Sequence, residues 1–101
     1  MDNDPELKWV AVDLDGCLAE SVWPDRGIGQ PIERNIIKLL EVDKAGYKII
    51  IHTARPWSDY ALIENWLNKY HLPFRRIVPG KILAMKYVDD RALNSESESW
   101  L

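Results

Sequence analysis

A short apolar run, from Trp9 to Val12, leads directly into two aspartates, Asp13 and Asp15, and then into Gly16. Side chains alternate faces along a strand, so the two carboxylates point the same way if the extended backbone continues through them. Two carboxylates held together repel each other unless a metal ion or a proton lies between them. The pattern therefore predicts a strand that ends in a site for metal-assisted chemistry.

The rest of the chain alternates between strand and helix patterns. Strands are expected at 8–12, 48–52, 74–78 and 84–88, and helices are expected from Pro31 to about Gly46 and over 58–70. The nearly continuous β-branched run at 48–52 is typical of a parallel strand that is buried on both faces. This order of elements predicts an α/β fold with a mostly parallel sheet.

Size and charge limit the classes of function. A chain of 101 residues fits a single domain, 1–101, with polar ends at 1–6 and 94–101 that are expected to be mobile. A net charge of −3 argues against a broad basic surface for duplex nucleic acid. Cys17, the single cysteine, excludes an internal disulfide. No signal peptide or membrane-spanning run is recognised, so a cytoplasmic protein without a membrane partner is expected.

Polar clusters follow three of the expected strands, beginning at Asp13, Thr53 and Asp89. The carboxyl ends of parallel strands share one edge of a sheet, and open α/β sheets bind their ligands there. We therefore expect these three clusters to form one site.

Four segments together resemble the motifs of the haloacid dehalogenase-like (HAD) superfamily. Asp13-Leu14-Asp15-Gly16-Cys17-Leu18 is similar to its first motif, with Cys17 where Thr or Val is usual. Thr53 after a strand, Lys81 upstream of the last strand, and Asp89-Asp90 at its end fit the second, third and fourth motifs. The resemblance implies a minimal Rossmann-like three-layer sandwich with four strands in the order 4-1-2-3.

A closer resemblance is to small HAD phosphatases of capsule or polysaccharide biosynthesis and to similar phage and bacterial proteins. The segments shared with them are Thr53-Ala54-Arg55, Trp66-Leu67, Leu72-Pro73-Phe74, Gly80-Lys81 and Tyr87-Val88-Asp89-Asp90-Arg91-Ala92. Ile82 departs from that pattern, which has Pro at the corresponding place. The loops are too short for the cap domain of larger members, so a capless form is implied.

The resemblance implies a Mg²⁺-dependent phosphatase that hydrolyses a phosphate monoester through an aspartyl-phosphate. Asp13 would be the nucleophile and Asp15 the general acid and base. Thr53 and Lys81 would bind the phosphoryl group, with Ala54 and Arg55 beside them in the substrate loop. The metal would be held by Asp13, Asp15 through its carbonyl, Asp89 and Asp90, the last either through water or only by holding Lys81 in place.

Several alternatives remain open from the sequence. The acidic net charge favours a sugar phosphate or a nucleotide as substrate over a nucleic-acid end. The small core is compatible with a homo-oligomer whose second subunit supplies a lid. A receiver-like signalling domain with a phosphorylated aspartate, or a catalytically idle HAD-like binding module, would use similar residues in place of an enzyme. Arg55 fits either a substrate contact or an ion pair with an acid.

Overall fold

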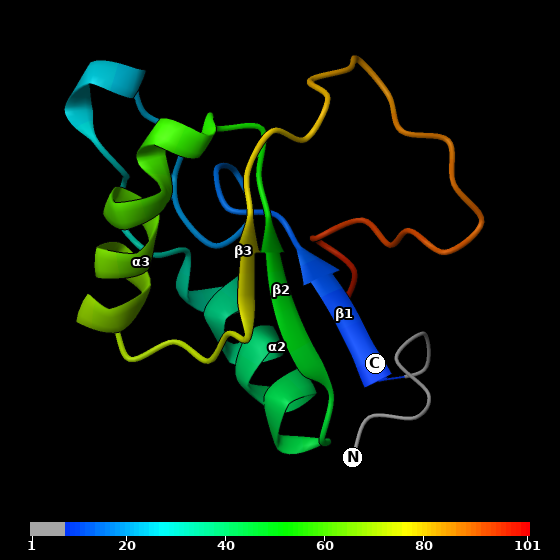
Figure 1. Cartoon of the computed structure of the whole chain (residues 1–101). Helices are drawn as coiled ribbons and strands as arrows, with labels where there is room; N and C mark the ends of the chain where they lie inside the picture. The colour runs from blue at the N-terminus through cyan, green and yellow to red at the C-terminus, as the bar shows by residue number, and fades with distance from the viewer. Residues whose placement is uncertain (1–7) are drawn as a thin grey trace.

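A computed structural model describes residues 8–101 and shows a small α/β protein. Its parallel sheet has three strands in the order β1-β2-β3, namely β1 (Trp9–Val12), β2 (Lys48–His52) and β3 (Arg76–Val78) (Figure 1). Val12 lies opposite Ile51, which in turn lies opposite Ile77. The α/β class and the first three expected strands are confirmed. The end at 1–6, expected to be mobile, lies outside the described residues.

Two α-helices connect these strands, α2 (Glu33–Lys44) and α3 (Tyr60–Lys69). The helix α2 begins two residues after Pro31, and its chain reverses at Gly46, whose φ of +94° suits a residue without a side chain. A short 3₁₀ turn, η2 (Trp57–Asp59), leads into α3, and a second, η1 (Pro24–Arg26), interrupts the loop before α2. Both expected helices are therefore confirmed with slightly shorter bounds.

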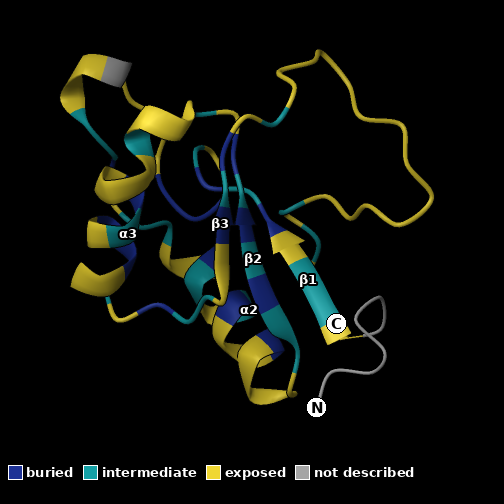
Figure 2. Cartoon of the chain, viewed as in Figure 1, coloured by how far each residue is buried: buried dark blue, intermediate teal, exposed yellow. Residues whose placement is uncertain are grey.

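The hydrophobic core lies on one face of the sheet. Because register neighbours share a face, the buried Val12, Ile49, Ile51 and Ile77 all point to the same side. Their core cluster includes the buried residues of both helices, Leu39, Val42, Ile63, Trp66 and Leu67. The opposite face keeps Ala11 exposed and Ile50 half-buried (Figure 2). The described residues thus form two layers, and the third layer of the expected sandwich is not among them.

The expected fourth strand at 84–88 is not formed. Within residues 8–101 the sheet has three strands, and the segment from Ile82 to Leu93 runs as an exposed loop away from β1 (Figures 1 and 2). Met85 is 96% exposed and Val88 is 99% exposed. An apolar strand is stable only when a neighbouring strand takes its backbone hydrogen bonds, and this segment is not paired in that way. Among residues 8–101, no further strand pairs with the outer edge of β1.

The C-terminal tail, which the sequence predicts to be mobile, contacts α2 in this structure. Arg34 Nε on α2 donates to Glu96 Oε1 at 2.8 Å, and the buried Asn35 donates to Glu96 Oε2 at 3.2 Å. Lys38 Nζ donates to the carbonyl of Ser95 at 3.1 Å. Trp100 packs against the core cluster. These contacts attach the tail to the N-terminal half of α2.

Among residues 8–101, no helix has both the length and the apolar character needed to cross a bilayer.

Candidate functional site

The turn that follows β1 is part of the core. Leu14 and Leu18 are fully buried, and the carbonyl of Leu14 accepts hydrogen bonds from the backbone N–H groups of Cys17, Leu18 and Ala19. Gly16 has a φ of +79°, which allows this tight reversal. Because the apolar side chains anchor the turn from inside, its two aspartates are left at the surface in fixed positions.

Asp13 is the first of these aspartates and lies at the carboxyl end of β1. Its Oδ1 accepts the backbone N–H of Leu14 at 2.8 Å, and its Oδ2 lies 3.8 Å from Lys81 Nζ. Burial raises the pKa of Asp13 above its ordinary value, while the Leu14 N–H and the charge of Lys81 act in the opposite direction. The side chain is still 42% exposed, so this carboxylate can meet a ligand.

Lys81 reaches Asp13 because two loops lie side by side at the end of the sheet. The N–H of Gly80 donates to the carbonyl of Arg55 at 2.8 Å, and the N–H of Lys81 donates to the carbonyl of Thr53 at 2.9 Å. These bonds extend the pairing of β2 with β3 into the loops. Lys81 Nζ also lies 4.5 Å from the ring centroid of Tyr87. The structure therefore brings together the residues of the expected first and third motifs.

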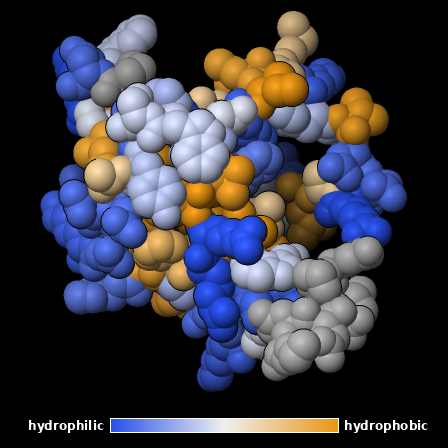
Figure 3. Space-filling view, viewed as in Figure 1, coloured by the Kyte–Doolittle hydropathy of each residue, from blue (hydrophilic) through white to orange (hydrophobic). Residues whose placement is uncertain are grey.

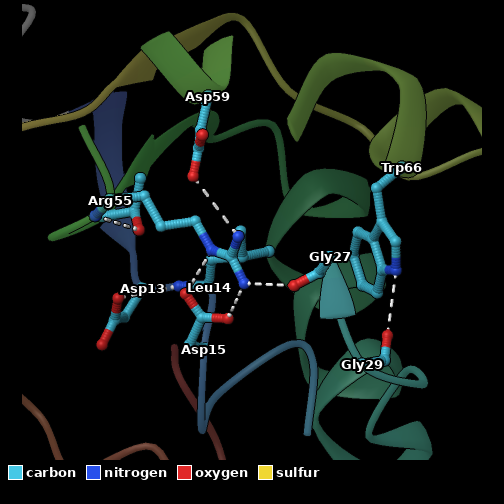
Figure 4. Close-up of polar contacts among 9 residues, drawn as sticks. Asp13, Leu14, Asp15, Gly27, Gly29, Arg55, Asp59 and Trp66 are labelled. Carbon is cyan, nitrogen blue, oxygen red and sulfur yellow. Dashed lines mark hydrogen bonds and ion pairs between the residues drawn. The ribbon is translucent and has the colours of Figure 1, made fainter. Parts of the chain in front are cut away.

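Asp15, the second aspartate, is held by Arg55. Arg55 Nε donates to Asp15 Oδ2 at 2.8 Å, and Arg55 Nη2 donates to Asp15 Oδ1 at 2.9 Å (Figure 4). The same guanidinium donates to the carbonyl of Gly27 at 2.8 Å and lies 3.4 Å from Asp59 Oδ2. The Asp15 hydrogen bonds raise the pKa of Arg55 further above its ordinary value. From the sequence, Arg55 could contact the substrate or form an ion pair with an acid. In this structure it forms the ion pair.

The two aspartates thus have separate cationic partners, Lys81 for Asp13 and Arg55 for Asp15. From the sequence alone, a metal ion or a proton is expected to relieve their repulsion. In the structure, side chains from the loops after β2 and β3 supply that positive charge.

Thr53 is buried at the carboxyl end of β2. Its N–H donates to the carbonyl of Val78 at 3.1 Å, and its Oγ1 accepts the N–H of Arg55 at 3.2 Å. The hydroxyl therefore closes the loop that carries Arg55. Ala54 is exposed in the same loop. The structure places both residues at the expected edge of the sheet, but the Thr53 hydroxyl does not point freely into a cavity.

A cavity of about 1160 Å³ opens between β1 and the C-terminal segment, and Figure 3 shows the molecular surface hollowed there. Asp13, His52, Lys81 and Asp89 are among its lining residues. The sequence motifs assign no role to His52. The register of β1 and β2 reveals its position, because the residues that follow the pair Val12–Ile51 are Asp13 and His52. This register is known only from the folded structure. The electrostatic interaction with His52 also acts to lower the pKa of Asp13.

The expected metal ligands do not converge in this arrangement. Among the described residues, no three carboxylate, imidazole or thiolate side chains lie close enough to hold an ion. Asp89 Oδ1 accepts the N–H of Arg91 at 2.8 Å in a local turn, and Asp90 is exposed in the same segment. The donor chemistry suits Mg²⁺, but the positions of these side chains do not fit an ion.

Cys17 lies beside this cavity but is not built for thiol chemistry. It is buried, and burial followed by the charge of Asp13 raises its pKa to about 12. A thiol in such surroundings stays protonated at neutral pH and is a poor nucleophile.

Comparison with known proteins gives a relative and a fold, but no activity. No model of a known protein family matches the sequence, and no curated protein matches it. The crystal structure of an MCSG target from Vibrio cholerae is similar, with a TM-score of 0.74 and 32% identity over 87% of this chain and 84% of that chain. At this identity and coverage the two proteins belong to one family.

A conserved protein from Bacteroides thetaiotaomicron shares the fold, with a TM-score of 0.59 and 23% identity. The match covers 68% of this chain and 55% of the Bacteroides thetaiotaomicron chain. The likeness supports the α/β architecture.

Proposed function

We propose that this protein is a Mg²⁺-dependent phosphatase of the HAD type that hydrolyses a phosphate monoester. The observation that carries the proposal is the position of Asp13. Its carboxylate is partly exposed at the carboxyl edge of the sheet, beside a cavity, with the ammonium of Lys81 3.8 Å away. A nucleophilic carboxylate needs a nearby cation to attract an anionic phosphoryl group, and Lys81 meets that need.

In the proposed reaction an Asp13 oxygen attacks phosphorus while the bond from phosphorus to the leaving oxygen breaks. Asp15 donates the proton that the leaving alcohol requires. A water molecule then attacks the phosphorus of the aspartyl-phosphate and gives one proton to Asp15, so that inorganic phosphate leaves and Asp13 is restored. Splitting the hydrolysis in this way replaces one very slow step by two faster ones.

Arg55 has a place in this scheme because it holds Asp15. Both Asp15 oxygens accept guanidinium hydrogen bonds, at 2.8 and 2.9 Å, so neither is free to face a leaving group. Asp15 can take up a proton from water and pass it to the leaving oxygen only after the guanidinium has turned away. The phosphoryl oxygens of a substrate offer Arg55 an alternative bidentate partner, so we infer that substrate binding releases Asp15 from Arg55.

The proposed metal requirement depends on the segment at 84–88. We propose that it pairs with the outer edge of β1 in the active protein, which gives the four-stranded order 4-1-2-3. Asp89 and Asp90 would then follow a strand at the same sheet edge as Asp13. Asp13, Asp89 and the carbonyl of Asp15 would hold Mg²⁺, with Asp90 nearby. The ion supplies charge neutralisation at the phosphoryl group when it is bound.

The proposed substrate is a phosphorylated small molecule, a sugar phosphate or a nucleotide, in preference to a nucleic-acid end. The net charge of −3 supports this preference, because a nucleic-acid chain is recognised mainly by a broad basic surface.

Hydrolysis of p-nitrophenyl phosphate with and without Mg²⁺ tests the proposal directly, with Asp13→Asn as the inactive variant. Magnesium-dependent turnover that is lost in Asp13→Asn supports the phosphatase. A stable phosphoryl group on Asp13 without turnover indicates the receiver-like alternative instead. If the protein neither hydrolyses the ester nor becomes phosphorylated, the phosphatase proposal is wrong and a binding module replaces it.

A further inference from the structure

Two exposed aromatic side chains lie on η2 and at the start of α3, shortly after Arg55 in the chain. Trp57 is 61% exposed and Tyr60 is 38% exposed. Their rings are parallel within 2°, and their centroids are 6.3 Å apart. The rings are stacked, and a stacked pair with exposed rings leaves aromatic faces on which a further ring can stack. We call this pair the Trp57–Tyr60 platform.

The platform is attached to the loops that position the two cations. A side-chain carbon added to Gly80 would lie 3.4 Å from Trp57 Nε1, so the indole rests against the backbone one residue before Lys81. Asp59 lies between the two aromatic residues in the chain and is 3.4 Å from Arg55 Nη1. The platform therefore has a fixed position relative to both Lys81 and Arg55.

We propose that the Trp57–Tyr60 platform binds the leaving group of the substrate by stacking against a flat ring face, from either a sugar or a nucleobase. The inference rests on the proposed phosphatase function and narrows its substrate class to monoesters whose alcohol carries a ring. In this proposal Lys81 and Arg55 bind the phosphoryl end, and the ring binds to the aromatic pair, which contacts the same two loops through Gly80 and Asp59. No cap domain is needed to hold the ring, because η2 and the start of α3 present the platform.

Steady-state kinetics with three substrates test the platform. The substrates are a nucleoside 5′-monophosphate, a hexose 6-phosphate and the acyclic glycerol 3-phosphate. Trp57→Ala is expected to raise KM roughly tenfold for a ring-bearing substrate, in line with the usual loss from removing one stacking partner. Its kcat/KM for glycerol 3-phosphate should stay within about twofold of wild type. The ring substrate that is affected identifies a nucleobase or a sugar as the stacked group.

Two control variants separate stacking from a general effect. Trp57→Phe keeps a flat face and should restore most of the affinity for the ring substrate. Ile37→Ala removes an apolar side chain that is 54% exposed on α2, and it should leave all three substrates unchanged. Equal losses for cyclic and acyclic substrates in Trp57→Ala would overturn the platform.

Binding measured by calorimetry distinguishes this failure from failure of the phosphatase proposal. The same three phosphates are titrated into the Asp13→Asn protein with and without Trp57→Ala. One outcome is that the wild type shows no hydrolysis at all while ring-bearing phosphates still bind in a Trp57-dependent way. In that case the platform stands and the phosphatase proposal falls. If binding of the ring-bearing phosphates does not depend on Trp57, the platform is wrong.

Discussion

Arg55 and Asp15 are 40 positions apart in the chain and form a two-point ion pair, with hydrogen bonds of 2.8 and 2.9 Å. Only 10% of the Arg55 side chain is exposed, and 30% of the Asp15 side chain. Through the carbonyl of Gly27 the same guanidinium also fixes the loop that precedes α2. This pair joins the turn after β1 to the loop after β2, so it contributes to the fold as well as to the site.

Replacing Arg55 by Ala is expected to lower the free energy of unfolding by about 1–3 kcal/mol, because Asp15 and the Gly27 carbonyl lose a charged donor while remaining partly buried. Urea denaturation followed by tryptophan fluorescence measures the change. Arg34→Ala is the matched control, since its 2.8 Å ion pair with Glu96 lies on the surface. The control should unfold close to wild type. Equal destabilisation of the two variants would contradict the structural role of Arg55.

Lys81 and Lys86 provide a second matched comparison. Both line the cavity, but the structure places only the ammonium of Lys81 beside Asp13, at 3.8 Å, within the described residues. Lys81→Ala is expected to lower kcat/KM for p-nitrophenyl phosphate at least about a hundredfold, as the loss of one charged transition-state contact typically does. Lys86→Ala should retain activity. If Lys86→Ala caused the larger loss, Lys81 would not be the phosphoryl-binding cation.

The strands and helices that sequence reasoning located are those with a clear local pattern. The run at 48–52 forms β2 with the predicted bounds, and Gly46 marks the end of α2 as predicted. The strand at 84–88 has equally suitable residues, yet it is unpaired. Local composition gives the tendency to extend, whereas pairing depends on contact with the distant edge of β1.

The same limit applies to the site: residues marked by local sequence patterns were predictable, and contacts between distant segments were not. Asp13 was found because it directly follows a strand, and Lys81 was found through the resemblance to the third HAD motif. The ion pair between Arg55 and Asp15 was left open, because the reach of a long side chain across 40 positions is not a local property. Asn35 was not expected in the core at all. It is buried because its amide donates to the Cys17 carbonyl at 2.9 Å, a partner that only the folded chain provides.

Asp13 is expected to reduce the stability of the fold at neutral pH. Its folded pKa is raised above the ordinary 3.8, mainly by burial. Between the unfolded and folded pKa values the native state binds more protons than the unfolded state, so stability falls as the pH rises through that interval. Asp13→Asn removes this cost and should melt at a higher temperature than wild type at pH 7.

The advantage of Asp13→Asn should shrink as the pH falls below 3.8, where the wild-type carboxyl becomes protonated in both states. Thermal melts of both proteins across this pH range measure it. A lower melting temperature for Asp13→Asn at pH 7 would show that its pairing with Lys81 outweighs the cost of burial.

Val88 tests whether the segment at 84–88 joins the sheet. As an exposed loop residue, 99% accessible, it should tolerate replacement by Lys with a change in unfolding free energy within about 0.5 kcal/mol. As part of a strand packed beside β1, it would become buried, and Val88→Lys would cost more than about 2 kcal/mol. Ile37→Lys on the exposed face of α2 is the control for adding a surface charge. We expect the larger loss, together with slowed amide hydrogen exchange at 84–88. A small loss with fast exchange would leave Asp89 away from Asp13 and remove the proposed metal site.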